Sequence, residues 1–396
     1  MNGVSPGIAS GRIKHVTTKA EAISAKQGDI VYAKYLSPPL VCAASKASGF
    51  IIAGHEADHA VSYLKECWKP CVLSEKSFKE GTEVTINGMS GNIFTGRKKI
   101  KEYQHHLPLK YKGKTKIYLH LSIPEIAEKA AALNTDGVGL LRTNLIIEAT
   151  GKHPYDYFVK KKKQNELRQI LAQVIKRIAQ AFAPKPVWIR TMDIPTDELV
   201  HFEGAQEKKE LNPLLGWRGI IRELQQPELL CIEYDAITDV LKTCKNIGII
   251  YPLVRDVSEY REAKRMLRKH GIIPHKDIKV GSMFETPSAA LQIDEFIEEG
   301  LDLAFIGMND LTQYTLAAER TNPRMKTIYN PIHPSVLRLV YEVIEKCTKE
   351  KIETTMSFLT PLKAVLPQLM EKGLSSVTLQ ADRINEIGKL IGDIER

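Results

Sequence analysis

Ile306-Gly-Met-Asn-Asp-Leu-Thr-Gln-Tyr314 and, upstream of it, Met283-Phe-Glu-Thr-Pro287 are the stretches on which the interpretation of this sequence rests. In each one a short apolar run, typical of a buried strand, ends next to oxygen ligands: Asn309, Asp310 and Glu285. Such ligands at the carboxyl ends of successive parallel strands form the kind of site that holds a magnesium ion against a phosphate. The alternative is that these side chains only cap the helices that follow.

The region from residue 115 to 396 repeats a pattern of an apolar strand followed by an amphipathic helix. Candidate strands lie at 116–121, 136–141, 186–190, 247–254, 278–284, 303–307, 352–356 and 374–379. This order favours an α/β fold with a (β/α)8 TIM barrel, and a doubly wound open sheet is the alternative.

Unusual polar residues follow these strands at their carboxyl ends, where such barrels carry their chemistry. They are Arg142, Arg190, Arg255, Glu285 and the pair Asn309 and Asp310. Structural salt bridges scattered over the surface would show no such preference, so the distribution supports the barrel.

Arginine side chains indicate what the barrel binds, because a guanidinium group presents a rigid fork of donors that matches phosphate or carboxylate oxygens. The candidates are Arg142, Arg190, Arg218 and Arg320. A magnesium ion held by Glu285 and Asp310 would bridge the phosphate of a small acidic substrate. We therefore predict phosphoryl transfer, in which protein groups mainly position the substrate and neutralise its charge.

Residues 1–95 carry short strand-like runs and turn glycines, which predict a compact β-rich domain. The basic, polar stretch 96–114 is interpreted as a linker to the barrel at 115–396. In the first domain His59 lies at a loop-to-helix junction, where a neutral imidazole can accept a phosphoryl group. His59 as a helix cap, and His55 as the acceptor, are the alternatives.

Composition excludes several classes of function. The 56 basic and 47 acidic residues give a net charge of +9, but the lysine run 160–163 is typical of a solvated face, so nucleic-acid binding is not expected. The six cysteines show no zinc-binding spacing. We find no leader sequence and no apolar run long enough to span a bilayer, and expect a cytoplasmic protein that does not bind membranes.

These motifs resemble those of the phosphoenolpyruvate-utilising enzymes, a family that includes phosphoenolpyruvate synthase, pyruvate phosphate dikinase and the first enzyme of the sugar phosphotransferase system. The resemblance covers essentially the whole chain, and the synthase is the nearest member. Further segments that carry it are Ser5-Pro-Gly-Ile-Ala-Ser-Gly11, Gly137-Val-Gly-Leu-Leu-Arg-Thr143, Gly151-Lys-His-Pro154, Ile189-Arg-Thr-Met-Asp193, Asn212-Pro-Leu-Leu-Gly-Trp-Arg218, Pro252-Leu-Val-Arg255 and Pro334-Ser-Val.

The resemblance implies a division of labour between two domains. Residues 1–95 would be the swivelling phosphohistidine domain, with His59 as the phosphate carrier, and 115–396 would bind phosphoenolpyruvate or pyruvate. Glu285 and Asp310 would hold Mg²⁺. Relatives commonly pair through the barrel, which implies a homodimer.

The resemblance also assigns the substrate-binding residues of the barrel. Arg142 and Arg190 would hold the phosphoryl group. Arg218 and Arg320 would help to bind the substrate, and Asn309 would contact it.

The sequence departs from the family pattern in three ways. The family's nucleotide-binding region, expected before the swivelling domain, is not found, which implies a separate ATP-binding subunit or phosphoacceptor protein. The loop Gly54-His-Glu-Ala-Asp58 carries two carboxylates where the family has an arginine. The family cysteine that protonates the enolate carbon aligns with Met356, whose thioether has no proton to transfer, and Cys347 is the nearest thiol.

Three hypotheses follow. The first is a phosphotransferase that exchanges a phosphoryl group between phosphoenolpyruvate and His59 and needs a partner protein. The second is a catalytically weak or inactive homologue that binds phosphoenolpyruvate and acts as a regulatory protein. The third is an enzyme in which another electrophile captures the enolate, or water protonates it.

Overall fold

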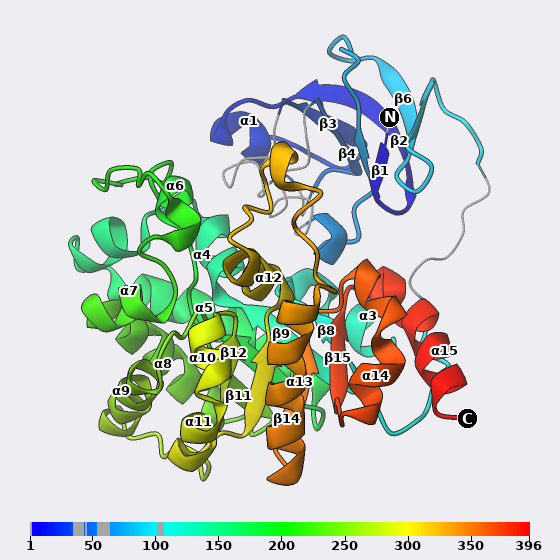
Figure 1. The fold of residues 1–396 in the computed structure, drawn as a ribbon. Helices are drawn as coiled ribbons and strands as arrows, with labels where there is room; N and C mark the ends of the chain where they lie inside the picture. Colours follow the sequence, from blue (N-terminus) through cyan, green and yellow to red (C-terminus); the bar gives the residue numbers. More distant parts are fainter. Residues whose placement is uncertain (1, 35–42, 44–45, 54–63, 101–106) are drawn as a thin grey trace. The chain divides into compact units, whose positions relative to one another are not determined.

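The computed structural model describes residues 2–34, 43, 46–53, 64–100 and 107–396. The chain divides into two compact units (Figure 1). The first consists of Met1–Pro108, Leu145–Lys152 and Gln380–Asp382, and the second of Leu109–Asn144, His153–Leu379 and Arg383–Arg396.

The described residues of the first unit contain a seven-stranded sheet in the order β1-β5-β4-β3-β2-β6-β7. Its strands are β1 (Asn2–Ser5), β2 (Ile8–His15), β3 (Asp29–Ala33), β4 (Gly49–Ile52), β5 (Cys71–Leu73), β6 (Glu83–Asn87) and β7 (Asn92–Thr95). Ile13, Ile30, Ile51 and Val72 belong to its buried apolar core. Helix α1 (Lys19–Ile23) begins with a capping box in which the Thr18 side chain accepts a hydrogen bond from Glu21 N.

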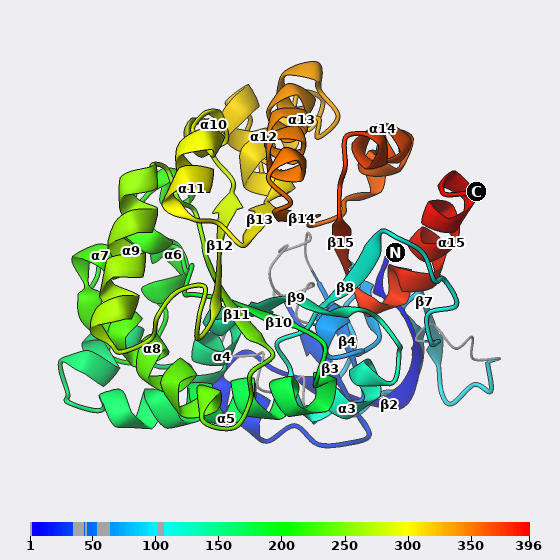
Figure 2. The same ribbon diagram turned by 90° about the horizontal axis from the view of Figure 1, so that it is seen from below.

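The second unit contains a parallel sheet that is nearly closed into a barrel (Figure 2). Within residues 107–396, all of which the structure describes, its eight strands are β8 (Lys116–His120), β9 (Gly137–Arg142), β10 (Val187–Arg190), β11 (Ile247–Tyr251), β12 (Lys279–Phe284), β13 (Leu303–Ile306), β14 (Glu353–Met356) and β15 (Ser376–Leu379). Sequence neighbours pair in parallel from β8 to β14, and β15 pairs with β8. The remaining seam between β14 and β15 carries a single bridge, Ser357 to Thr378.

This arrangement confirms the predicted α/β fold with a parallel eight-stranded barrel. Consecutive strands lie side by side around the ring, whereas a doubly wound sheet would reverse its strand order at one point.

Helices surround the barrel strands, as the view along the barrel shows (Figure 2). They are α3 (Ala127–Ala131), α5 (Gln164–Phe182), α6 (Thr196–Leu199), α7 (Ile220–Gln225), α8 (Pro227–Leu241), α9 (Val257–Lys269), α10 (Pro287–Leu291), α11 (Ile293–Glu299), α12 (Met308–Leu316), α13 (Pro334–Lys349), α14 (Leu366–Glu371) and α15 (Ile384–Ile394). Helix α4 (Thr143–Thr150) follows β9 directly, and its residues from Leu145 onward belong to the first unit. Helix α5 shows why they lie there, because it buries Leu167, Leu171 and Ile175 at helical spacing. In the part of the chain that the structure describes, no helix has the length and apolar character needed to cross a bilayer.

Side chains inside the barrel form a packed apolar cluster. Its members are Leu140, Trp188, Ile250, Met283, Leu303 and Phe305. Successive side chains of a strand point to opposite faces, so the residue two positions after an interior one also faces the interior. Arg190 therefore follows Trp188 on the interior side, and Glu285 follows Met283, one layer nearer the carboxyl edge.

Candidate functional site

A chain of alternating charges lies at the carboxyl edge of the barrel. Arg190 Nη1 is 3.4 Å from Asp193 Oδ2. Arg218 grips the same carboxylate with two donors, Nε at 2.7 Å from Oδ1 and Nη2 at 2.6 Å from Oδ2. Arg218 Nη1 reaches Asp310 Oδ1 at 3.4 Å, and Arg320 Nη1 reaches Asp310 Oδ2 at 3.3 Å. Segments that follow β10 and β13 thus meet in one network.

Arg218 has all three of its donor nitrogens directed to carboxylates. Its side chain is 4% exposed, and that of Asp193 is 1% exposed. Burial alone would lower the pKa of Arg218, but the charges of Asp193 and Asp310 raise the pKa well above its ordinary value. A bidentate pair of this kind fixes both partners, so Arg218 holds Asp193 and Asp310 in position.

Arg190 differs from Arg218 because its buried guanidinium group is only partly satisfied by hydrogen bonds and by negative charges. Its Nη2 donates to Asn144 Oδ1 at 2.7 Å. Its Nε is buried and has no hydrogen-bond partner within the described part of the chain. Burial lowers the pKa of Arg190, Asp193 and Glu285 oppose this effect, and Arg142 and Arg218 add to it. The guanidinium group therefore retains both a donor and a positive charge that an anion can satisfy.

Glu285 is a buried acid of this edge whose pKa is raised. It is 3% exposed, and its Oε2 accepts a hydrogen bond of 2.8 Å from Leu253 N. Burial, followed by the charges of Asp310 and Asp193, raises the pKa of Glu285 to about 8, although Arg190 and Arg218 oppose the shift. Gly307 makes room for it, because a Cβ at that position would lie 2.3 Å from Glu285 Cγ.

The donor set around Glu285 fits a magnesium ion. Together with burial, the negative charges of Asp310 and Asp193 raise the pKa of Glu285. A divalent cation would have the opposite effect and favour the ionised form of Glu285. The described residues contain no group of three His, Cys, Asp or Glu side chains placed to hold a metal ion. Mg²⁺ is nevertheless often bound by only one or two carboxylates together with substrate oxygens and water. Glu285 and Asp310 would be those two ligands.

Of three other predicted residues, two lie near this network. Arg142 ends β9 and contributes to the pKa shift of Arg190. Asn309 is exposed in the first turn of α12, where the Tyr329 hydroxyl lies 3.3 Å from its Oδ1. Arg255, in contrast, pairs with Glu259, whose Oε1 is 3.7 Å from Arg255 Nη1.

Sequence reasoning missed two members of the site. Asp193 lies within the quoted segment Ile189-Arg-Thr-Met-Asp193 but was not assigned a role, because its pairing with Arg218 joins residues 25 positions apart. His120 ends β8 and experiences the charges of Arg142 and Arg190. The sequence could have indicated His120, because it is a polar residue at the carboxyl end of a predicted strand.

Met356, which aligns with the family cysteine, is the buried last residue of β14. Thr355 Oγ1 lies 2.9 Å from Thr378 Oγ1, and Thr355 is the register partner of the interior residue Phe305. Met356 therefore points to the opposite side, toward the helix layer. Cys347 is also unsuitable, because its thiol is buried in α13 and burial raises its pKa to about 12. Neither side chain can deliver a proton to the barrel interior.

His59, His55 and the loop Gly54-His-Glu-Ala-Asp58 lie outside the described residues. His59 as the acceptor of the phosphoryl group therefore stays a prediction from the sequence.

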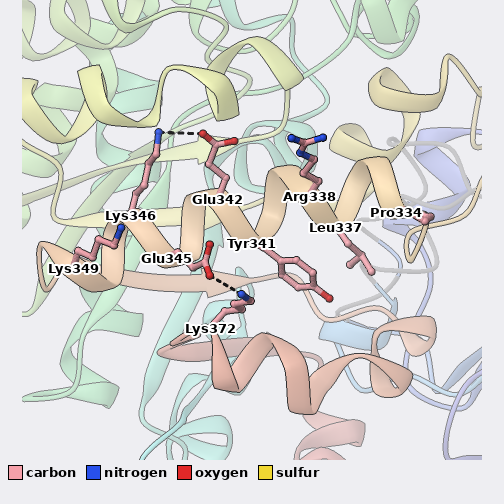
Figure 3. A pocket seen from close by; sticks show the side chains of 9 residues that line it. All are labelled: Pro334, Leu337, Arg338, Tyr341, Glu342, Glu345, Lys346, Lys349 and Lys372. Atoms are coloured by element: carbon pink, nitrogen blue, oxygen red, sulfur yellow. Dashed lines mark hydrogen bonds and ion pairs between the residues drawn. The ribbon is translucent and has the colours of Figure 1, made fainter.

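A cavity of 710 Å³ lies elsewhere, on the outer face of the barrel beside α13 (Figure 3). Its lining includes two ion pairs, Lys346 Nζ to Glu342 Oε1 at 3.0 Å and Lys372 Nζ to Glu345 Oε1 at 2.6 Å. None of the residues of the carboxyl-edge network lines it, so this cavity is separate from the candidate site.

Comparison with known proteins agrees with the sequence motifs. Residues 97–396 match the model of the PEP-binding domain of PEP-utilising enzymes. A phosphoenolpyruvate synthase from Pyrococcus furiosus is 38% identical over 413 residues, which cover 100% of this chain and 50% of that protein. A probable phosphoenolpyruvate synthase from Archaeoglobus fulgidus is 34% identical over 407 residues, which cover 100% of this chain and 54% of that protein. The chain spans about half the length of these curated relatives.

Among solved structures, a HpcH/HpaI aldolase/citrate lyase family protein from Burkholderia cenocepacia shares 13% identity with a TM-score of 0.40, over 72% of this chain and 93% of its own.

Proposed function

The chain belongs to the family of phosphoenolpyruvate-utilising enzymes, and from this premise we propose that it exchanges a phosphoryl group between phosphoenolpyruvate or pyruvate and a histidine, like a phosphoenolpyruvate synthase. The observation that carries the proposal is Arg190, a buried guanidinium with an unsatisfied Nε donor at the carboxyl edge of the barrel. A charged donor in that state favours binding of an anion. Arg142 adds a second positive charge beside it.

Each residue of the edge then has a role that its contacts support. Arg142 and Arg190 hold the phosphoryl oxygens. Asn309 and Arg320, which α12 and the segment after it supply, contact the remainder of the substrate. Arg218 acts through Asp193 and Asp310, because its donors are already directed to these carboxylates.

Magnesium would be held by Glu285 and Asp310. When bound, it would neutralise charge on the phosphoryl and enolate oxygens of the substrate. The protein groups do the positioning, since Arg190, Arg218 and Arg320 are paired with carboxylates before the substrate arrives and need little reorganisation. Water-excluded, preorganised charges are more effective than the same charges in solvent.

The acceptor is proposed to be His59 of a swivelling domain formed by residues 1–95 and joined by the linker 96–114 to the barrel at 115–396. The bond between the phosphorus and the enol oxygen breaks, and a bond between the phosphorus and an imidazole nitrogen forms. The other product is the enolate of pyruvate, which takes a proton at carbon from a water molecule. A separate nucleotide-binding or phosphoacceptor protein would complete the cycle, and a homodimer is the expected assembly.

The proposal is tested by incubating the full chain with phosphoenolpyruvate labelled with ³²P and with Mg²⁺. We expect label on the protein that is labile to acid, stable to base and absent from the His59→Ala variant. A chain that binds phosphoenolpyruvate by calorimetry yet takes up no label would contradict the transfer step and support a binding homologue. A chain that does not bind it would contradict the site itself.

A further inference from the structure

Two buried carboxyl groups lie next to each other on consecutive helices of the barrel unit. Glu223 on α7 is fully buried, and Glu233 on α8 is 3% exposed. Each lies within hydrogen-bonding reach of the other. Two ionised carboxyl groups can only accept hydrogen bonds and would repel each other, so this contact needs a proton on one of them. Burial, followed by the charge of Glu233, accordingly raises the pKa of Glu223 well above its ordinary value.

This carboxyl pair, Glu223 and Glu233, contacts the segment that follows β10. The Thr191 hydroxyl donates a hydrogen bond of 2.7 Å to Glu223 Oε2. The backbone N of the next residue, Met192, donates to Glu233 Oε2 at 3.3 Å. Both residues of the segment are buried. Two carboxyl groups from different helices therefore hold two consecutive residues of one segment.

The same segment carries two charged residues of the candidate site. Arg190 directly precedes Thr191, and Asp193 directly follows Met192. Arg190 Nη1 lies 3.4 Å from Asp193 Oδ2, and Arg218 Nη2 lies 2.6 Å from the same oxygen. A displacement of the two central residues would move both of their neighbours, because the peptide units that join them are rigid. The position of the Arg190 guanidinium group therefore depends on how the segment is held.

The second oxygen of each carboxyl group lacks a donor from the rest of the protein. Oε1 of Glu223 and Oε1 of Glu233 are buried, and neither has a hydrogen-bond partner within the described part of the chain. Most buried polar atoms in folded proteins are paired, so two unpaired oxygens in neighbouring groups call for an explanation. A proton held between the two carboxyl groups explains them, because it turns one group into a donor and leaves the other as its acceptor.

We propose that Glu223 and Glu233 share a proton and act together as positioning residues, which hold the segment from Arg190 to Asp193 in the conformation that binds the phosphoryl group. This assignment rests on the proposed function, because it takes phosphoenolpyruvate as the ligand. Neither carboxyl group touches the substrate, and both act through Arg190. Sharing a proton leaves one negative charge on the pair and avoids the repulsion between two.

The test is calorimetric titration of the full chain with phosphoenolpyruvate in the presence of Mg²⁺. Alanine at position 223 or 233 removes the hydrogen bonds of that side chain. Glutamine keeps them, because its amide N–H can replace the shared proton and its carbonyl oxygen still accepts from the segment. Glu228→Ala is the control, since Glu228 is exposed on α8.

We expect Glu223→Ala and Glu233→Ala each to bind phosphoenolpyruvate at least about tenfold more weakly, because a displaced Arg190 loses charge-assisted hydrogen bonds to the phosphoryl group. Glu223→Gln and Glu233→Gln should bind with nearly the affinity of the wild type, and so should the control. Wild-type affinity in both alanine variants would overturn the assignment. Equal losses in the alanine and glutamine variants would do so too, because rescue by the amide is what hydrogen-bonded positioning requires.

Failure of this assignment can be told apart from failure of the proposed function. A wild-type chain that binds no phosphoenolpyruvate would refute the proposed function. Normal binding by the wild type together with unaffected alanine variants would refute only the role of the carboxyl pair.

Infrared spectroscopy tests the shared proton without a ligand, and it also covers the case in which the alanine variants do not fold. A protonated carboxyl group has a carbonyl stretching band that lies apart from the bands of carboxylates and amides. At neutral pH this band should be weaker in the double variant Glu223→Gln, Glu233→Gln than in the wild type. Glu285 is present in both proteins, so its contribution cancels in the difference spectrum. Spectra without such a difference would refute the shared proton.

Discussion

Replacing Glu285 with glutamine tests the electrostatics of the site without a ligand. The pKa of Glu285 is raised from 4.5 to about 8 in the folded protein, first by burial and then by Asp310 and Asp193. Folding therefore favours the protonated form. The contribution of Glu285 to the unfolding free energy is fully present below pH 4.5. It is lost as the pH rises toward 8, where the buried carboxyl group must ionise.

The magnitude follows from the interval between these two pKa values. At about 1.4 kcal/mol per pH unit, it corresponds to at most about 5 kcal/mol of unfolding free energy. Glutamine has nearly the same shape and cannot ionise. We therefore expect Glu285→Gln to become more stable relative to the wild type as the pH rises from 5 to 8, by several kcal/mol in total.

The assay is urea denaturation with a chelator present, at a series of pH values between 5 and 8, followed through the fluorescence of Trp188 and Trp217 in the barrel unit. Glu298→Gln is the matched control, because Glu298 is exposed on α11. Added Mg²⁺ should stabilise the wild type more than Glu285→Gln, and more at pH 8 than at pH 6, because metal binding competes with the proton. A difference between wild type and variant that does not change with pH would refute the reasoning.

Three further substitutions separate binding from stability. Arg190→Ala and Asp310→Ala should each abolish binding of phosphoenolpyruvate while circular dichroism and thermal unfolding show an intact fold, and normal affinity in both would remove them from the site. Arg218→Ala should instead lower the unfolding free energy by about 3–5 kcal/mol, because it leaves the buried Asp193 carboxylate without its principal partner; a loss below about 1 kcal/mol in urea denaturation would contradict this role. Met356→Cys should leave the rate of pyruvate formation unchanged, since position 356 faces the helix layer, and a clear gain in the coupled assay would mean that the side chain reaches the interior.

The arrangement of the barrel could be predicted because each of its strands has a strong local signal. The run 303–307 is apolar throughout, and 278–284 is apolar apart from Lys279 and Ser282, which is typical of strands that helices cover on one face and a packed interior on the other. The strands β13 and β12 lie where these runs predicted them. Polar residues that follow such runs must then meet at one edge, because parallel strands end at the same side of the sheet.

The pairing of charges at that edge could not be predicted, because it depends on distances between segments far apart in the chain. The sequence indicated that Arg218 binds substrate, but it did not show that the donors of this side chain are directed to Asp193 and Asp310. The orientation of Met356 could not be predicted either, for a local reason. Glu353-Thr-Thr-Met356 shows no alternation of polar and apolar residues, so the pattern does not reveal which side chains face inward.

The most direct test of the central claim is whether a divalent ion and the phosphate of phosphoenolpyruvate meet at Asp310 and Glu285. Mn²⁺ in place of Mg²⁺ would broaden the ³¹P resonance of the bound ligand through its unpaired electrons. We predict strong, protein-dependent broadening with the wild-type chain and a large reduction with Asp310→Asn at equal concentrations. Broadening of the same size in both proteins would contradict this site.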